Sequence, residues 1–294
     1  MPEPGNLKQG FKSKKTMQFF LQINWNINPE IFRIGGFALR YYSIMFALAF
    51  YFSYLVLSKI YIKENVSINL LNKLAIFVFI GTLVGARLGH TLFYEFGYYK
   101  HHLLEMILPF RIDSNGKFEL TGYQGLASHG GAIGIIVAVA WYCRKYKQSF
   151  LWVLDRLVIV VALSAFFIRI GNLLNSEIIG KPTNVAWAFI FERVDMIPRH
   201  PAQLYEAISY LIIFSILWLL YKKKIQKVQQ GFVFGCFLIL LFSVRFLLEF
   251  VKENQEAFEN TLPFNMGQIL SVPFVLIGLY LMLLKSKQEY EGYT

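Results

Sequence analysis

Apolar residues in this chain come in seven blocks of roughly twenty, separated by shorter polar segments. The blocks cover residues 37–58, 74–96, 125–143, 151–175, 203–221, 231–251 and 266–284. A run of about twenty apolar residues is long enough to cross a bilayer as an α-helix, and a helix satisfies its own backbone groups there. The pattern therefore predicts an all-α integral membrane protein, a bundle of about seven transmembrane helices.

The composition agrees with this prediction. Hydrophobic residues make up 56% of the 294 positions, charged residues only 16%, and the mean hydropathy is +0.46. A soluble domain usually carries about 25% charged residues. We expect residues 17–294 to form a single polytopic transmembrane domain, and the polar, basic residues 1–16 to be an N-terminal extension outside it.

The net charge of +11 comes mostly from basic residues in the segments between the apolar blocks. One alternating set of segments holds 12 Lys and Arg in 41 residues, including the run 222–224, whereas the other set holds 7 in 69. Basic residues concentrate in cytoplasmic loops, so we expect the N-terminus outside and the C-terminus inside. The same distribution argues against nucleic acid as a partner. Cys143 and Cys236 lack the spacing of a metal site.

Ionisable residues inside apolar blocks are costly and mark functional sites. The blocks of this chain contain or border on Arg40, Arg87, His90, His129, Arg169, Glu206, Arg245 and Glu249. Single cases have simpler explanations: an Arg near a helix end can reach the headgroups, and Arg245 with Glu249 one turn later can form an ion pair. The predicted orientation nevertheless puts them all in the outer half of the bundle. Because Arg donors match phosphate geometry, this convergence predicts a lipid-phosphate site.

Three segments combine polar residues in ways that helix capping alone does not explain. They are SHGGAIG at 128–134, RIGNLLNSEIIG at 169–180 and RHPAQLYE at 199–206. Glycines in the first permit close backbone approach, and Pro201 in the third suits a helix start. Neither explanation accounts for the Arg, Asn, His and Glu residues beside them.

Taken together, these segments resemble those of the prolipoprotein diacylglyceryl transferase family, and the resemblance covers about residues 20–285. The matching features are RxGNxxNxExxG at 169–180, HGG at 129–131, RHPxQLYE at 199–206, GxRLG at 85–89, MGQxLSxP at 266–273, and the pair Arg245 and Glu249. A joint match of this kind is far more specific than any one motif.

The resemblance implies an enzyme that moves the diacylglyceryl group of phosphatidylglycerol onto the lipobox cysteine of preprolipoproteins, the first step of bacterial lipoprotein maturation. A thioether forms and glycerol phosphate leaves. The implied location is the bacterial plasma (inner) membrane, with a multi-pass chain and the active site toward the periplasmic face. The implied partners are phosphatidylglycerol, the lipobox peptide and membrane lipids. Neither a metal nor an organic cofactor is expected.

Roles follow from the resemblance and the chemistry. Fixed cations stabilise the charge that develops on departing glycerol phosphate, and the candidates are Arg169 and Arg245, with Arg87 a weaker third. The attacking thiol must lose a proton. His129 is the candidate base because imidazole titrates near neutral pH. The alternative is that His129 only positions the lipid. Alternative acceptors or organisers are Tyr42, which we count among the catalytic candidates, Glu177 and Glu206.

The remaining candidates are expected to bind substrate. The predicted binding residues are Arg87, Gly130, Gly131, Arg169, Asn172, Glu177, Gly180, Arg199, His200, Glu206 and Glu249. Two positions depart from the family pattern. Arg40 stands where many members carry His or a neutral residue, and Leu241 replaces a Tyr one turn before Arg245, which puts a hydroxyl contribution from that helix in doubt.

Three other functions fit this sequence less well. A transporter or flippase would place charges or broken helices near the midplane, whereas the charges here cluster in the outer half. An intramembrane serine protease is suggested by Ser128 beside His129, but the chain lacks GxSxG and adjacent residues guarantee no catalytic geometry. A membrane scaffold gives no reason for three polar motifs in one leaflet.

Overall fold

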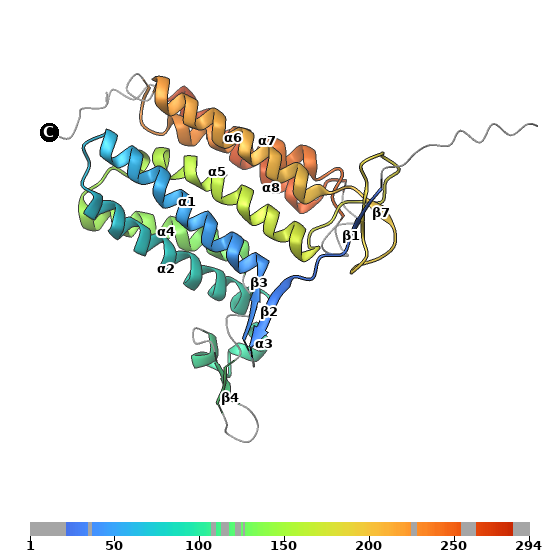
Figure 1. The fold of residues 1–294 in the computed structure, drawn as a ribbon. Helices are drawn as coiled ribbons and strands as arrows, with labels where there is room; N and C mark the ends of the chain where they lie inside the picture. The colour runs from blue at the N-terminus through green and yellow to red at the C-terminus, as the bar shows by residue number, and fades with distance from the viewer. Residues whose placement is uncertain are drawn as a thin grey trace, which may run out of the picture.

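A computed structural model describes residues 22–34, 37–106, 110–112, 118–120, 125, 127–224, 228–253 and 263–284 (Figure 1). The predicted extension at 1–16 lies outside the described residues. Within them, the long helices are α1 (Tyr41–Lys63), α2 (Ile68–Phe93), α4 (Ser128–Tyr146), α5 (Phe150–Asn175), α6 (Ala202–Lys224), α7 (Phe232–Leu248) and α8 (Met266–Leu283). Two short helices, α3 (Phe96–Tyr99) and the 3₁₀ turn η1 (Leu103–Met106), follow α2.

The long helices run side by side in three groups (Figure 1). α6, α7 and α8 lie on one side, α1 and α5 in the middle, and α2 and α4 on the opposite side. α5 is the central helix: it contacts α1, α4, α6 and α7, and half of its most apolar stretch is buried. Polar residues at the end of α5 can therefore meet residues from several other helices.

Small residues let α2 and α4 approach closely. Gly81, Gly85 and Gly89 on α2 face Gly130 and Gly134 on α4, and a Cβ added to Gly89 would lie 2.6 Å from the Gly130 Cα. Backbones come this close only where side chains are minimal, a common arrangement between membrane helices. Gly130 of the HGG segment thus has a clear packing role.

Five of the described helices are long and apolar enough to cross a membrane: α1, α2, α5, α6 and α8. α7 is a shorter apolar helix of 17 residues, and α4 has 19 residues, with Arg144 and Lys145 in its last turn. The mostly helical, multi-pass character of the chain is confirmed. The count of seven spans and the orientation of the termini stay predictions.

Three small sheets accompany the helices, so the all-α expectation was incomplete. Their strands are β1 (Ile23–Trp25), β2 (Glu30–Ile34), β3 (Phe37–Arg40), β4 (Phe110–Ile112), β5 (Phe118–Leu120), β6 (Phe189–Phe191) and β7 (Pro198–Arg199). β1 pairs in parallel with β6, which pairs antiparallel with β7. The other two sheets are the antiparallel pairs β2–β3 and β4–β5.

The β1–β6–β7 sheet covers the end of the bundle where α5 ends and α6 begins, which we call the capped end (Figure 1). Trp25 Nε1 donates a hydrogen bond to the Leu173 carbonyl at 2.9 Å, which ties β1 to α5. Phe189 and Phe191 are buried with Leu173 in a small cluster of their own. The cap therefore fixes the connection between α5 and α6, which carries two of the three motif segments.

Two predicted span boundaries were wrong for local reasons. Residues 37–40 were assigned to the first apolar block but form β3, which pairs with β2, and the helix begins only at Tyr41. α2 begins at Ile68, ahead of the predicted start at 74, because the Ser67 side chain accepts a hydrogen bond from the Asn69 amide and caps the helix.

Candidate active site

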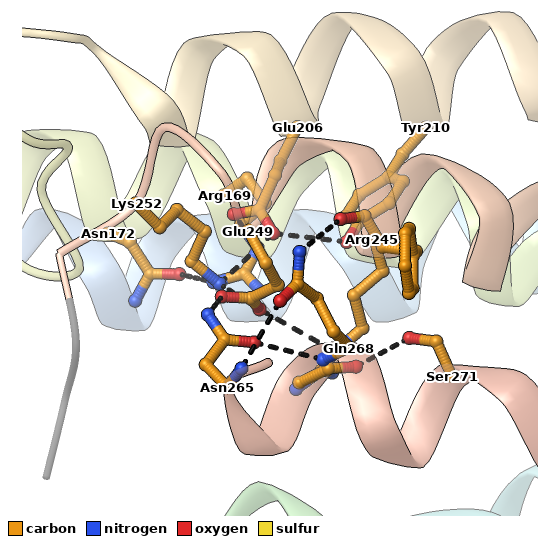
Figure 2. A network of polar contacts seen from close by, with 12 residues as sticks. Arg169, Asn172, Glu206, Tyr210, Arg245, Glu249, Lys252, Asn265, Gln268 and Ser271 are labelled. Atoms are coloured by element: carbon orange, nitrogen blue, oxygen red, sulfur yellow. Dashed lines mark hydrogen bonds and ion pairs between the residues drawn. The ribbon is translucent and has the colours of Figure 1, made fainter. Parts of the chain in front are cut away.

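Polar side chains from four helices meet at the capped end and form what we call the polar network (Figure 2). Its members are Arg169 and Asn172 from the end of α5, Glu206 and Tyr210 from the start of α6, Arg245 from α7, Glu249 and Lys252 just after it, Asn265 as the N-cap of α8, and Gln268 and Ser271 within α8. Each of these helices begins or ends here, so its terminal polar residues face the others.

Arg169 is the centre of one half of the polar network. Its Nε lies 2.9 Å from Glu206 Oε2, and its Nη1 donates to Asn172 Oδ1 at 3.2 Å. The Glu206 side chain is 1% exposed and that of Arg169 16%. Tyr210 donates its hydroxyl to Glu206 Oε1 at 3.4 Å. Since both charges are largely removed from water, each depends on the other for compensation.

Glu249 is the centre of the other half. Lys252 Nζ donates to its Oε1 at 2.8 Å, and Asn265 Nδ2 donates to its Oε2 at 3.1 Å. Arg245 is held more loosely, with its Nε 3.8 Å from the same Oε1. Lys252 also joins the two halves, because its Nζ lies 3.6 Å from Glu206 Oε1.

The polar network carries more positive than negative charge. Arg169, Arg245 and Lys252 face the carboxylates of Glu206 and Glu249, and only the Arg245 side chain, 40% exposed, is open to a ligand to any large degree. An uncompensated charge in a poorly hydrated site is costly. The network is therefore complementary to one additional anion, and a guanidinium is suited to bind phosphate oxygens.

The exit of α5 is organised around Glu177. Its two carboxylate oxygens accept hydrogen bonds from Asn172 Nδ2 at 3.3 Å and Asn175 Nδ2 at 3.1 Å. Its backbone carbonyl accepts from Gln203 Nε2 at 2.6 Å. Asn172 thus connects this loop to Arg169, so the RxGNxxNxE segment folds as one hydrogen-bonded unit.

Gly180 lies where two chain segments cross. Its amide donates to the His200 carbonyl at 3.0 Å, and it forms a β-bridge with Lys252. A Cβ at this position would fall 2.6 Å from the His200 Cβ and 2.9 Å from the Val251 carbonyl oxygen. Only glycine fits without displacing backbone, so Gly180 fixes the approach of the Lys252 segment to the α5–α6 loop.

Arg199, a predicted substrate-binding residue, is engaged with protein groups. It is largely buried, pairs with Asp195 at 2.6 Å and with Glu253, and donates to the Gly180 carbonyl at 3.2 Å. Its hydrogen bond holds the pKa of Asp195 below the usual range. Arg199 thus clamps the capped end rather than facing an open site.

His200 and Tyr42 lie near the polar network without belonging to it. His200 Nδ1 is 3.2 Å from the Tyr205 hydroxyl, and burial lowers the pKa of His200, so its imidazole is neutral at neutral pH. The Tyr42 ring packs on Gly171, where an added Cβ would lie 2.9 Å from its Cδ2. Its phenol lies within electrostatic range of Glu177 and Arg169.

Arg87, from the α2–α4 layer, contacts the segment that follows α2. Its guanidinium donates to the Tyr99 hydroxyl at 3.0 Å and to the carbonyls of Glu105 and Met106 at 2.8 and 3.1 Å. These bonds fix α3 and η1 to the end of α2.

His129 stands in the first turn of α4 and is exposed. Its ring contacts those of Phe93 and Tyr94, with centroids 5.5 and 5.8 Å apart. Near it, Gly131 has room for a side chain, because a Cβ added there would lie 3.5 Å from the Ala86 Cβ, an ordinary contact distance. The structure therefore does not bring His129 into contact with the polar network.

Sequence reasoning missed five members of the polar network: Tyr210, Lys252, Asn265, Gln268 and Ser271. Tyr210 lies one turn after Glu206 on the same helix face, which is a usable signal. Gln268 belongs to the MGQxLSxP segment and forms a capping box with Asn265. Lys252 follows an apolar block and reads as an ordinary loop lysine. In the described part of the chain, no group of three or more His, Cys, Asp or Glu side chains is arranged to hold a metal.

Comparison with known proteins gives a consistent result. The sequence profile of a family described as prolipoprotein diacylglyceryl transferase matches residues 29–284. A protein of Bacteroides fragilis named phosphatidylglycerol–prolipoprotein diacylglyceryl transferase is 49% identical over 92% of this chain and 97% of its own length. Proteins of the same name from Tolumonas auensis and Chloroherpeton thalassium are each 44% identical over 90% of this chain, and over 98% and 95% of their own lengths.

Proposed function

The chain belongs to the prolipoprotein diacylglyceryl transferase family, and from this premise we propose that it transfers diacylglyceryl from phosphatidylglycerol to the lipobox cysteine of preprolipoproteins. The cysteine sulfur bonds to the glyceryl carbon that carries the phosphate. The bond between this carbon and the phosphate oxygen breaks, and the oxygen leaves with glycerol phosphate. The thiol proton leaves to a base. The step involves no change in overall oxidation state.

The charge of the polar network is the observation that carries this proposal. Phosphatidylglycerol brings one negative phosphate, and the network has one more cation than carboxylates. Leaving glycerol phosphate gains negative charge as the C–O bond breaks, so fixed cations stabilise the transition state more than the ground state. Arg169 and Arg245 fill this role, and Asn172 and Glu177 hold Arg169 and its loop in place.

His129 takes the thiol proton in this proposal. Its exposed position in the first turn of α4 suits a group that meets a substrate entering from outside the bundle. The competing assignment is that His129 only positions the lipid, while Tyr42, Glu177 or Glu206 serves the thiol. Tyr42 lies within electrostatic range of Arg169, which supports it as an organiser of the reacting groups.

A split between kcat and KM separates the two roles of His129. If His129 is the base, we expect His129→Gln to lower kcat by about 10²-fold, the usual contribution of a general base, with little change in KM. If His129 only positions the lipid, the variant should raise KM and keep kcat. The measurement is the initial rate of peptide lipidation with varied lipid and peptide, with His101→Gln, an exposed histidine outside the polar network, as the matched control.

The proposed setting is the bacterial plasma membrane, with seven spans, the N-terminus outside and the polar network toward the periplasmic leaflet. Residues 17–294 would then form a single catalytic domain. The distribution of basic residues between alternate loops supports this orientation. In this orientation the capped end, where the polar network lies, is on the side to which secreted substrates are delivered.

The direct test uses purified protein, phosphatidylglycerol in nanodiscs and a lipobox peptide containing cysteine. We expect a peptide mass increase of one diacylglyceryl group with equal release of glycerol phosphate. Arg245→Ala should reduce the rate by about 10²-fold, because Arg245 is the most exposed cation of the network. Arg193→Ala, which removes an exposed arginine elsewhere at the capped end, and a serine-for-cysteine peptide are the controls. Intact lipid and unmodified peptide with folded wild-type protein would refute the proposal.

A further inference from the structure

Lys252 is the least expected member of the polar network. Its side chain is 3% exposed, although it follows α7 in what the sequence presents as a loop. Its backbone is fixed by the β-bridge to Gly180 and by neighbouring hydrogen bonds between Lys181 and Val251 and between Glu253 and Ile179. The backbone around Lys252 is therefore fixed on both sides of the residue. A buried ammonium is tolerated only beside carboxylates that compensate its charge, so Lys252 is an integral part of the site.

Lys252 occupies the carboxylate oxygen that Arg245 would otherwise bind. Its Nζ is 2.8 Å from Glu249 Oε1, whereas Arg245 Nε is 3.8 Å from the same atom. Asn265 takes the other oxygen at 3.1 Å. In the described part of the chain, the buried Nε of Arg245 has no hydrogen-bond partner. Arg169 differs, since it makes a close ion pair with Glu206.

From this competition we propose that Lys252 is a positioning residue that keeps Arg245 available for the phosphate of the lipid substrate. By engaging Glu249, and Glu206 at 3.6 Å, it prevents a closed Arg245–Glu249 pair and supplies the positive charge in excess of the two carboxylates. Without Lys252, two cations and two carboxylates would cancel, and Arg245 would turn onto Glu249. The inference rests on the proposed function, because it assumes that an anionic lipid is the ligand.

The test compares variants that differ in the number of cations and carboxylates in the polar network. Lys252→Met keeps the length and apolar stem but leaves two cations and two carboxylates. We expect it to raise KM for phosphatidylglycerol and the dissociation constant for that lipid by on the order of 10-fold, the effect of one charge-assisted contact, with a smaller change in kcat. Adding Glu249→Gln to Lys252→Met removes the competing carboxylate and restores one excess cation. The double variant should therefore regain most of the lost lipid affinity.

The matched control is Lys181→Met, which removes an exposed ammonium that donates to the Phe250 carbonyl nearby. This variant should leave KM within about twofold. Lipid affinity is measured on intact protein in nanodiscs by native mass spectrometry, with zwitterionic phosphatidylethanolamine for comparison. A double variant as weak as Lys252→Met would mean that Lys252 contacts the phosphate directly, and would overturn the proposal. So would Lys252→Met with lowered thermal stability and unchanged lipid affinity. Wild-type protein that binds the lipid but forms no thioether would instead refute the proposed function, and the binding measurements would still decide the role of Lys252.

Discussion

Arg169→Ala is expected to lower kcat/KM for lipid transfer on the order of 10³-fold, the largest effect on activity that we predict. The guanidinium is placed to stabilise charge on departing glycerol phosphate, and removal of one such donor typically costs about 10² to 10³. Arg169→Lys should recover little. A lysine has a compact charge and cannot reproduce the planar arrangement that now binds both Glu206 and Asn172. Initial rates measured with varied lipid and peptide give kcat and KM for each variant.

Removing Arg169 also leaves the buried Glu206 carboxylate with weaker compensation, so a loss of folding must be separated from a loss of catalysis. Arg169→Ala with Glu206→Gln removes both charges together and should unfold at a temperature closer to wild type than the single variant. Its activity should stay as low. Arg33→Ala, an exposed arginine on β2 that pairs with Glu30, should keep wild-type rates. Activity restored by the double variant would show that Arg169 acts only as a structural partner.

Gly130→Ala is expected to destabilise the protein by about 1–3 kcal/mol, whereas Gly131→Ala should be nearly neutral. Both changes add one methyl group to α4 and gain the same helix propensity. At Gly130 the new Cβ would lie 2.6 Å from the Gly89 Cα, and the backbone of α2 must move. At Gly131 it would meet the Ala86 Cβ at 3.5 Å, an ordinary contact. The measurement is the thermal unfolding temperature of both variants and of wild-type protein in the same detergent.

The same pair of variants tests the prediction that Gly130 binds substrate. If its role is to let α2 and α4 approach, activity of Gly130→Ala per folded molecule should stay near wild type at low temperature. If the lipid or peptide touches Gly130, the added methyl group should raise KM with little change in the unfolding temperature. Equal stability of the Gly130→Ala and Gly131→Ala proteins would contradict the packing role.

Helix positions were largely predictable because apolar block length is a strong signal in a membrane protein. α7 and α8 fall within the predicted ranges 231–251 and 266–284, and α5 ends at Asn175 as predicted. Residues 37–40 were misassigned because an apolar strand next to an apolar helix gives one continuous block. The β1–β6 pairing was not predictable, since it joins three-residue strands that lie far apart in sequence.

The convergence of Arg169, Glu206, Arg245 and Glu249 could be anticipated, because ionisable residues at corresponding depths in several spans must meet or remain uncompensated. Lys252 could not, because its burial follows from the bridge to Gly180 and not from any local pattern. Arg87 and Arg199 were chosen because they lie in the GxRLG and RHPxQLYE segments, and the structure shows their donors bound to nearby loops. Their roles in substrate binding stay predictions.

The pairing of β1 with β6 has a consequence for the order in which the chain folds during synthesis. Ile23 pairs with Phe189, so the earliest described strand must wait until α1, α2, α4, α5 and most of the α5–α6 connection have been made. Contacts that span so much sequence close late. The Gly180–Lys252 bridge needs α7 as well. The Arg169–Glu206 pair can form once α5 and α6 are both inserted, whereas Glu249 and Lys252 reach it only after α7 has also been synthesised. The site is therefore assembled in two stages.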